Sequence, residues 1–402
     1  MKTIASLVLI LHGFSEIFAF SAYVSISFIS EIVYISLVLI FYKNVFTSKF
    51  LNEFFIFVVV LIATTYIYSL FSGISDDKSF LNLFQYIIIL FHIFVLTDIF
   101  RRFGREFFFK HFLTGFFIVI SFGYADFFFS NVLSFSLDSV LPRSSVQYNT
   151  GSQLGLMRMR SVFREAGYYA NYLNVCALVL LGYYYGSKKF TLILFGYISS
   201  LLLTFSGTGI VCAIIMFTVK MVVFSERNVR KNIQKIIVFS ILATSSVYTL
   251  SGNEYVEKLV DKITLDDSSA SVRDRSNRYS YLSSDLDVLT NSYVNLLTGL
   301  GNGHLISEQR SYLNIYINFL ISNGIIVFIS FTFVIISAFK FIFKQARRDK
   351  AYEYILLSLF SFLFHFLFTQ GTFILALWLP LICYPLLLRC DYKKNYDKAL
   401  LG

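Results

Sequence analysis

Apolar stretches long enough to cross a lipid bilayer recur along most of the chain, with short polar segments between them. A helix needs about 20 apolar residues to cross the hydrocarbon core of a bilayer, and about twelve stretches approach this length. They fall at about 4–20, 24–42, 54–71, 80–100, 112–130, 168–186, 190–205, 210–224, 233–250, 312–339, 351–369 and 373–389. The pattern predicts an all-α polytopic membrane protein with about twelve transmembrane helices. We expect residues 1–402 to form a single integral membrane domain.

The composition agrees with a membrane location. Hydrophobic residues make up 56% of the chain and charged residues 14%, and the mean hydropathy is +0.68. Soluble domains carry about 25% charged residues, so this chain has too few to cover a water-facing surface. A soluble enzyme is therefore excluded. The four cysteines lie within or beside apolar stretches, which predicts buried thiols. The five histidines lack the spacing of metal ligands, and we expect no metal ion or other cofactor.

Two longer polar segments, at 131–167 and 251–311, interrupt the predicted helices. Most of the 34 Lys and Arg residues fall elsewhere, in short segments on the same side as the N-terminus. Short cytoplasmic loops are enriched in Lys and Arg. This distribution therefore predicts that both termini are cytoplasmic and that the two long segments are extracytoplasmic loops. Because membrane orientation accounts for the net charge of +10, we expect membrane lipids as partners and no nucleic acid.

Arginine is the commonest basic residue in these two loops. The loop arginines are Arg143, Arg158, Arg160, Arg164, Arg273, Arg275, Arg278 and Arg310. A guanidinium group presents a planar fork of donors that binds phosphate in two places. Each arginine could instead pair with a neighbouring carboxylate or touch a lipid headgroup. Their concentration in two loops on one face favours an anionic ligand.

The end of the first loop, from Arg158 to Asn171, leads into a predicted helix. Arg160 and Arg164 are four residues apart and could share a helical face. Glu165 at the helix N-terminus would interact favourably with the helix dipole. The tyrosines that follow are either interface anchors, which we favour for Tyr172, or a platform for stacking sugars; they are Tyr168, Tyr169 and Tyr172.

Two further segments carry candidate contacts. Gly299 and Gly301 would permit a tight turn with exposed backbone N–H groups, and such a nest can hold phosphate. Asn314 and Asn318, one turn apart near the start of the next apolar stretch, are either helix–helix hydrogen-bonding groups or sugar contacts. Tyr316 between them is a packing residue or a sugar contact.

The stretch Arg160…Glu165-Ala166-Gly167-Tyr168…Ala170 resembles the Arg…Glu-Pro-Gly/Ser signature of Wzy-type O-antigen and capsular polysaccharide polymerases. The turn Ser206-Gly207-Thr208-Gly209 is similar to a short Ser-Arg-Thr-Gly turn of that family. The arginines near 273–278, then Gly299-Leu300-Gly301 and Asn314-Ile315-Tyr316, resemble the motif order of the wider O-antigen polymerase/ligase superfamily. The chain departs from these patterns at three positions: Ala166 replaces Pro, Gly207 replaces Arg, and Leu313 replaces the His of ligase-like members.

The resemblance implies a GT-C-like glycosyltransferase architecture and a metal-independent, inverting glycosyl transfer at the bacterial cytoplasmic membrane. The substrates would be oligosaccharides linked to undecaprenyl diphosphate, and a chain-length regulator and a flippase would be partners. It implies catalytic roles for Arg160, Glu165 and Arg278, with Glu165 as the base or merely paired to Arg164. Diphosphate would contact Arg164, Arg273, Arg275 and Arg310. The rest of the substrate would contact Tyr168, Tyr169, Gly299, Gly301, Asn314 and Tyr316.

Three other functions are compatible with the pattern. A ligase would move the finished chain to another acceptor. A flippase or transporter requires ionisable residues inside the spans. The sequence shows no evident pairing among the ionisable residues in or near the spans, which are Glu31, His92, Asp98, Asp126 and His365. A structural membrane protein would leave the loop arginines without a role.

Overall fold

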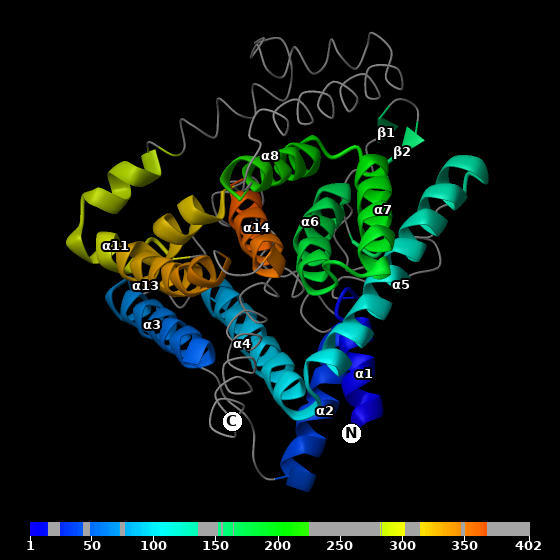
Figure 1. The fold of residues 1–402 in the computed structure, drawn as a ribbon. Helices are drawn as coiled ribbons and strands as arrows, with labels where there is room; N and C mark the ends of the chain where they lie inside the picture. Colours follow the sequence, from blue (N-terminus) through cyan, green and yellow to red (C-terminus); the bar gives the residue numbers. More distant parts are fainter. Residues whose placement is uncertain are drawn as a thin grey trace.

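The computed structural model describes residues 1–14, 25–42, 49–72, 77–135, 152–153, 156–163, 165–224, 282, 284–301, 314–346 and 350–367. These residues are mostly helical (Figure 1). The helices are α1 Lys2–Leu11, α2 Ile26–Tyr42, α3 Lys49–Ser72, α4 Asp77–Phe103, α5 Arg105–Val132, α6 Ala166–Tyr183, α7 Lys188–Leu203, α8 Gly207–Val223, α11 Tyr293–Thr298, α13 Ile315–Ala346 and α14 Lys350–His365. Two short antiparallel strands, β1 Ser152–Gln153 and β2 Leu156–Met157, lie in the first long polar segment.

Every predicted apolar stretch that falls on described residues overlaps a helix, so the predicted mainly helical class is confirmed there. The stretches at 233–250 and 373–389 lie outside the described residues, as does most of the segment 251–311. Among the described residues, two helical segments are long and apolar enough to cross a membrane, Arg105–Val132 in α5 and Ile315–Lys344 in α13. Shorter apolar helices include α2 and α14.

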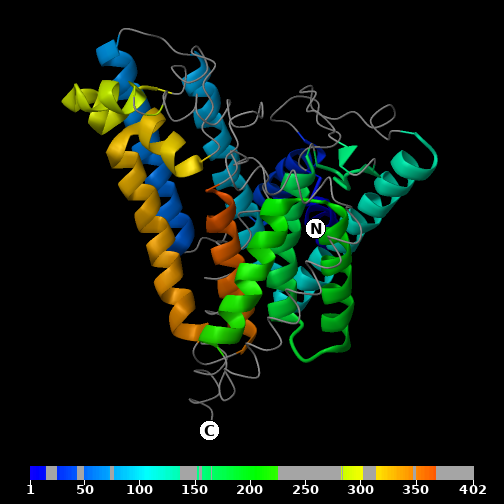
Figure 2. The ribbon, with the colours of Figure 1, turned by 90° about the horizontal axis from the view of Figure 1, so that it is seen from above.

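Helix α6 lies at the centre of one group of helices. Nearly all of its side chains are buried, and it packs against α5, α7, α8 and α14. Figure 1 shows α6 between α14 and α7. A second group consists of α3, α4, α11 and α13, in which α3 packs against both α4 and α13. Seen from above in Figure 2, α14 lies between the α3–α13 pair and the α6–α8 group.

Helix α2 buries several polar side chains and exposes several large apolar ones. Ser27, Ser30 and Glu31 are buried, whereas Ile40 is 67% and Phe41 69% exposed. In water this arrangement would be unfavourable, because the exposed apolar area of α2 would be larger than the area that single apolar residues normally expose on a soluble protein. Against lipid it is favourable, because polar groups are hidden in the helix bundle. The arrangement of α2 therefore fits a bilayer.

Candidate functional site

The segment that precedes α6 is tied to two neighbouring helices by backbone and side-chain hydrogen bonds. The Met157 N–H donates to Asn131 Oδ1 (2.6 Å), and Asn131 Nδ2 donates back to the Met157 carbonyl (3.1 Å). The Met159 N–H donates to the Leu203 carbonyl (3.0 Å), and Arg158 Nε donates to the Thr204 carbonyl (3.0 Å). The segment is therefore held between the ends of α5 and α7.

A tight turn follows and carries Arg160. Ser161 has φ of 55°, a left-handed conformation that is strained for a residue with a Cβ atom. Its Oγ donates to the Val119 carbonyl at 2.6 Å, and the Phe163 N–H donates to the Arg160 carbonyl at 3.1 Å. Gly123 allows this turn to lie close to α5, because a Cβ atom added at Gly123 would lie 2.4 Å from Met159 Cε. Strained turns of this kind are frequent at functional sites.

Arg160 forms an ion pair with Asp126 of α5, with 3.7 Å between Nε and Oδ2. Arg160 is only 8% exposed and Asp126 2%. Removing either group would leave an uncompensated charge in a region of low dielectric. The separation exceeds that of a good hydrogen bond, so the contact is mainly electrostatic. Asp126 thus provides the countercharge for a buried guanidinium.

The structure corrects the prediction that Arg160 and Arg164 share a helical face. Arg160 lies in the turn, and α6 begins only at Ala166. Arg164 lies outside the described residues. So do the remaining predicted phosphate-binding arginines, Arg273, Arg275, Arg278 and Arg310. Arg160 is therefore the predicted phosphate ligand that the structure describes.

Glu165 is the N-cap residue of α6, with extended backbone angles. Its side chain makes no capping hydrogen bond, while its carbonyl accepts from the Tyr169 N–H at 3.2 Å. The prediction that Glu165 stands at a helix N-terminus is confirmed. Its carboxylate is therefore favourably placed in the field of the helix dipole.

The structure also corrects the role of Tyr169. Tyr169 and Tyr172 are fully buried, and the Phe163 ring stacks against both, with centroids 5.7 and 5.1 Å away. The Tyr172 hydroxyl donates to His12 Nε2 at 3.0 Å. A buried ring offers no face to a sugar, so Tyr169 is a core residue, and Tyr172 is no interface anchor. Tyr168 lies at the edge of the core and is partly exposed.

The turn at Ser206–Gly209 lies beside the same segment. Ser206 is the N-cap of α8 and accepts from the Gly209 N–H through Oγ (3.3 Å). Gly209 packs directly on α6, where an added Cβ atom would lie 2.5 Å from the Ala170 Cβ atom. The carbonyl groups of Leu203 and Thr204, just before this turn, accept hydrogen bonds from the segment that carries Arg160. The turn, Glu165 and Arg160 therefore belong to one region around the start of α6.

Gly299 and Gly301 do not form an open nest. The Leu300 N–H donates to the Ile321 carbonyl (2.8 Å), and the Gly301 N–H donates to the Ser322 carbonyl (3.0 Å). The Gly299 N–H is likewise used, by the Asn295 carbonyl (2.7 Å). These bonds fasten the glycine turn to a kink in α13 at Gly324, which has φ of 73°. The glycines therefore allow two backbones to touch, and their N–H groups do not face a phosphate.

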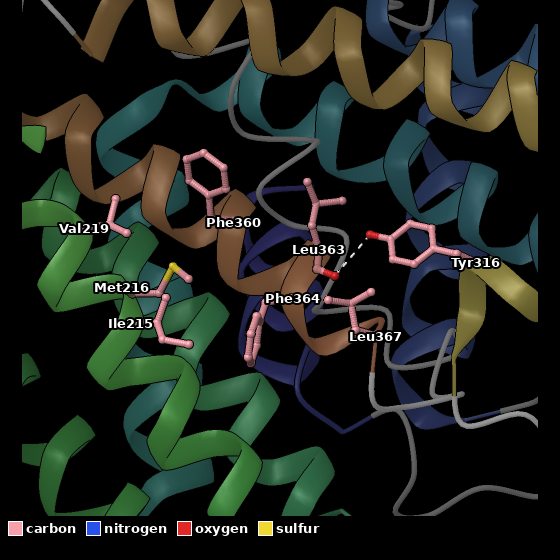
Figure 3. A pocket seen from close by; sticks show the side chains of 8 residues that line it. All are labelled: Ile215, Met216, Val219, Tyr316, Phe360, Leu363, Phe364 and Leu367. Atoms are coloured by element: carbon pink, nitrogen blue, oxygen red, sulfur yellow. Dashed lines mark hydrogen bonds between the residues drawn. The ribbon is translucent and has the colours of Figure 1, made fainter.

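Asn314 caps α13 by accepting from the N–H groups of Tyr316 (2.9 Å) and Ile317 (3.2 Å) through Oδ1. The Tyr316 hydroxyl donates to the Leu363 carbonyl at 3.1 Å. Tyr316 borders an apolar cavity of about 330 Å³ between α8, α13 and α14 (Figure 3). The cavity is otherwise lined by Ile215, Met216, Val219, Phe360, Leu363, Phe364 and Leu367.

Some polar contacts were not predicted from the sequence. The sequence shows Asp126 as an ionisable residue near a span, and a carboxylate in an apolar stretch signals a buried partner. Asn174 of α6 joins three other elements: it donates to the Gly209 carbonyl (2.9 Å) and to His365 Nε2 (3.0 Å), and accepts from the Tyr197 hydroxyl (2.6 Å). This cluster holds α7, α8 and α14 around α6.

The structure shows pairing among the ionisable residues in the spans that is not evident from the sequence. Glu31 pairs with His92, and Asp126 pairs with Arg160. Asp98 accepts from the Tyr34 hydroxyl (2.7 Å) and from Arg102 Nε and a terminal guanidinium nitrogen (both 3.1 Å). Paired carboxylates within apolar helices are typical of functional positions in membrane proteins.

No family model matches the chain, and no curated protein matches its sequence.

Proposed function

We propose that this protein is a polysaccharide polymerase of the bacterial cytoplasmic membrane. It transfers a growing O-antigen, capsule or exopolysaccharide chain from undecaprenyl diphosphate onto a lipid-linked repeat unit on the outer face of the cytoplasmic membrane. The observation that carries the proposal is the buried Arg160 guanidinium, which a strained turn holds 3.7 Å from Asp126. The resemblance of the surrounding motifs to Wzy-type polymerases supplies the reaction.

In this reaction an acceptor sugar hydroxyl attacks the anomeric carbon of the donor. A new C–O bond forms with inversion while the bond from that carbon to the diphosphate oxygen breaks. The electron pair of the broken bond leaves with the lipid diphosphate, and the hydroxyl proton passes to a base. Donors aimed at the oxygen where charge develops contribute most to such a rate. Arg160 supplies this positive charge without a metal ion.

Asp126 is the exchangeable countercharge in this mechanism. While no substrate is bound, it compensates Arg160 and so avoids an isolated buried charge. Because the contact is longer than a hydrogen bond, the guanidinium can bind a diphosphate instead, and the freed Asp126 carboxylate then takes up a proton so that it does not remain as an isolated buried charge. Glu165, at the start of α6, accepts the proton of the attacking hydroxyl.

The proposal includes residues beyond the described part of the chain. Arg164, Arg273, Arg275, Arg278 and Arg310 bind the diphosphate together with Arg160, and Arg278 is also catalytic. The sugars, or the part of the lipid next to the sugars, contact Tyr168, Asn314 and Tyr316. Both termini are cytoplasmic, and a chain-length regulator and a flippase act with the protein.

The test is to replace Arg160 by Ala in cells that depend on this chain for surface glycan. We expect the protein to insert normally while polymer formation falls about 100- to 1000-fold, as when a donor to a developing anion is removed. Single lipid-linked repeat units should accumulate, as measured by gel analysis of extracted glycans. The matched control is Arg105→Ala. Arg105 lies over the Tyr183 ring (4.8 Å), about 30 Å along α5 from Asp126, and its loss should leave polymer intact.

Other outcomes would contradict the proposal. Polymer of normal length and amount in Arg160→Ala would exclude a phosphate-binding role for this residue. Accumulation of long lipid-linked polymer would indicate a ligase.

Transport of a lipid-linked oligosaccharide is a second candidate function, favoured by the buried Glu31–His92 pair. Intramembrane acid–histidine pairs are typical of proton-driven transporters. Under this alternative, inactive variants would trap the repeat unit on the cytoplasmic leaflet. A polymerase variant would leave it on the outer leaflet, where an added glycosidase can reach it.

A further inference from the structure

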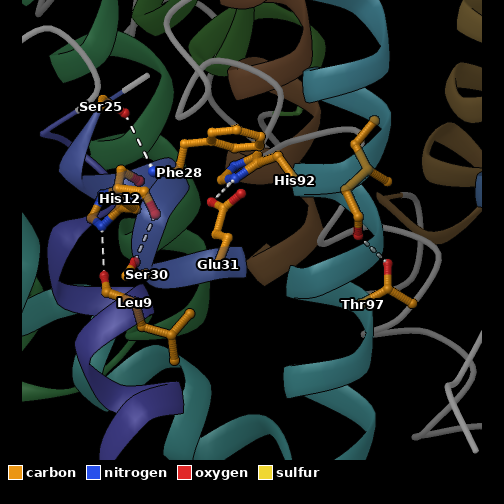
Figure 4. A network of polar contacts seen from close by, with 10 residues as sticks. Leu9, His12, Ser25, Phe28, Ser30, Glu31, His92 and Thr97 are labelled. Carbon is orange, nitrogen blue, oxygen red and sulfur yellow. Dashed lines mark hydrogen bonds and ion pairs between the residues drawn. The ribbon is translucent and has the colours of Figure 1, made fainter. Parts of the chain in front are cut away.

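A second polar site lies within the helices, apart from Arg160. Glu31 of α2 and His92 of α4 face each other, with 2.5 Å between Oε1 and Nδ1 (Figure 4). Glu31 is 0% and His92 1% exposed. Their outer atoms, Glu31 Oε2 and His92 Nε2, are also buried and have no hydrogen-bond partner among the residues that the structure describes. Ser27 Oγ, one turn before Glu31 on α2, is likewise buried and unpartnered.

Counting protons shows what these unpartnered atoms can do. One proton shared between Nδ1 and Oε1 makes their hydrogen bond, and with this proton alone the pair carries a charge of −1. A net charge buried in a medium of low dielectric is very costly. A second proton, on His92 Nε2 or Glu31 Oε2, makes the pair neutral overall. The unpartnered atoms are therefore the positions where this second proton binds and leaves.

The other charged groups nearby do not neutralise the pair. On α1, His12 donates from Nδ1 to the Leu9 carbonyl (2.7 Å) and accepts the Tyr172 hydroxyl at Nε2, so it is neutral. On α4, the Arg102 guanidinium, a cation that could neutralise a negative pair, is bound to Asp98. On the helices packed against α4, Glu53 of α3 accepts from Ser337 (2.8 Å). On α5, the carboxylate of Asp126 is paired with Arg160. The remaining titratable groups on a neighbouring helix lie at the start of α5 and are Arg105, Glu106, Lys110 and His111. In that part of α5 the side chains that point into the core are phenylalanines.

The pair is connected to the Arg160 region through α1. Figure 4 shows His12 beside the α2 segment that carries Ser30 and Glu31. His12 bonds to Tyr172 of α6, and Tyr172 packs against Phe163 of the Arg160 turn, with ring centroids 5.1 Å apart. A change in how α2 packs on α1 and α4 therefore reaches the turn through two side-chain contacts.

We propose that Glu31 and His92 form a proton-binding site inside the membrane domain, which takes up and releases one proton. Proton binding keeps α2 packed on α4, and proton release loosens this packing and, through His12 and Tyr172, the Arg160 turn. The proposal does not depend on the polymerase function. It identifies the ligand as a proton because the unpartnered atoms are fully enclosed and include a carboxylate and an imidazole.

The test is infrared difference spectroscopy of the full chain in liposomes, between low and high pH. Proton uptake by the pair appears at low pH as a protonated-carboxyl band, an imidazolium band or both. We expect this signal to be lost in Glu31→Gln and lost or shifted in His92→Gln. Glu53→Gln is the matched control, because it removes another helix glutamate that is already hydrogen-bonded, and it should retain the signal.

A wild-type spectrum that matches that of Glu31→Gln at every pH would show a fixed pair and overturn the proposal. So would a signal that follows Na⁺ or K⁺ at constant pH, which would indicate a metal-cation site. If a variant does not elute as folded protein, ¹⁵N NMR of wild-type protein labelled at histidine provides the second measurement. A buried histidine whose ring nitrogens titrate supports the proposal, and the absence of any such histidine contradicts it. Since neither readout uses catalysis, failure here leaves the polymerase proposal standing.

Discussion

Two of the ion pairs in the described part of the chain, Glu31–His92 and Arg160–Asp126, differ in what can reach them. Glu31 and His92 belong to helices, lie at hydrogen-bond distance and are fully enclosed. Arg160 belongs to a strained turn, lies 3.7 Å from Asp126 and keeps a small exposed area. A helix within a membrane cannot give up its backbone hydrogen bonds without large cost, whereas a turn can rearrange.

This difference indicates that burial alone does not define a site. The Glu31–His92 pair is enclosed between α2 and α4, so any ligand larger than a proton would require the two helices to separate before it could bind. The Arg160–Asp126 contact is longer, at 3.7 Å, and belongs to a long polar segment, and in the proposed mechanism an anion competes with Asp126 there. The following predictions test this contrast, from the largest expected effect to the smallest.

The largest effect is expected from Glu31→Ala. The change leaves His92 buried without its partner and opens a cavity between α2 and α4. Breaking a buried pair by removing one partner typically costs about 3–5 kcal/mol, and we expect unfolding in detergent micelles to be destabilised by that amount. The double variant Glu31→Leu/His92→Leu removes both polar groups and should recover most of this loss, because apolar replacement of a buried pair is often neutral.

Denaturant titration followed by circular dichroism measures both variants. A double variant that is as unstable as the single variant would show that the pair itself holds α2 and α4 together.

A smaller effect is expected from Asp126→Asn, and it should appear in binding. Without the competing carboxylate, Arg160 is available to a diphosphate, so inorganic pyrophosphate should inhibit polymer formation at about 3- to 10-fold lower concentration. This corresponds to about 0.7–1.4 kcal/mol. Asp98→Asn is the matched control, because Asp98 pairs with Arg102 in a separate cluster, and its inhibition constant should be unchanged. Equal or weaker inhibition in Asp126→Asn would contradict the role of Asp126 as an exchangeable countercharge.

The helices were predictable from the sequence because membrane spans depend on local composition, which each apolar stretch carries by itself. The start of α6 at Glu165 was predictable for the same reason. The pairing of Glu31 with His92 was not, because it depends on which helices become neighbours and how they are rotated, and the residues are separated by 61 positions. The partner of Arg160 was missed for the same reason.

The glycine and tyrosine motifs show a second limit. Gly299 and Gly301 fit a phosphate nest by local conformation, but long-range packing on α13 uses their N–H groups. Tyr169 has the polar tip of an interface residue, yet the turn at Phe163 covers it completely. A local motif defines what a residue can do, and tertiary contacts decide whether its groups are available.

The smallest effect concerns the strain in the turn itself. Ser161→Ala removes the hydrogen bond to the Val119 carbonyl, worth about 1 kcal/mol, and keeps a side chain at φ of 55°. Ser161→Gly removes the same bond but relieves the left-handed strain, which is worth about 1–2 kcal/mol and is partly offset by greater freedom of the unfolded chain. We therefore expect the Gly variant to be more stable than the Ala variant by about 0.5–1 kcal/mol. Thermal unfolding of the two proteins side by side measures this difference. If the Ala variant were the more stable, the left-handed turn would not be strained, and strain would not distinguish the Arg160 turn from the helices that carry Glu31 and His92.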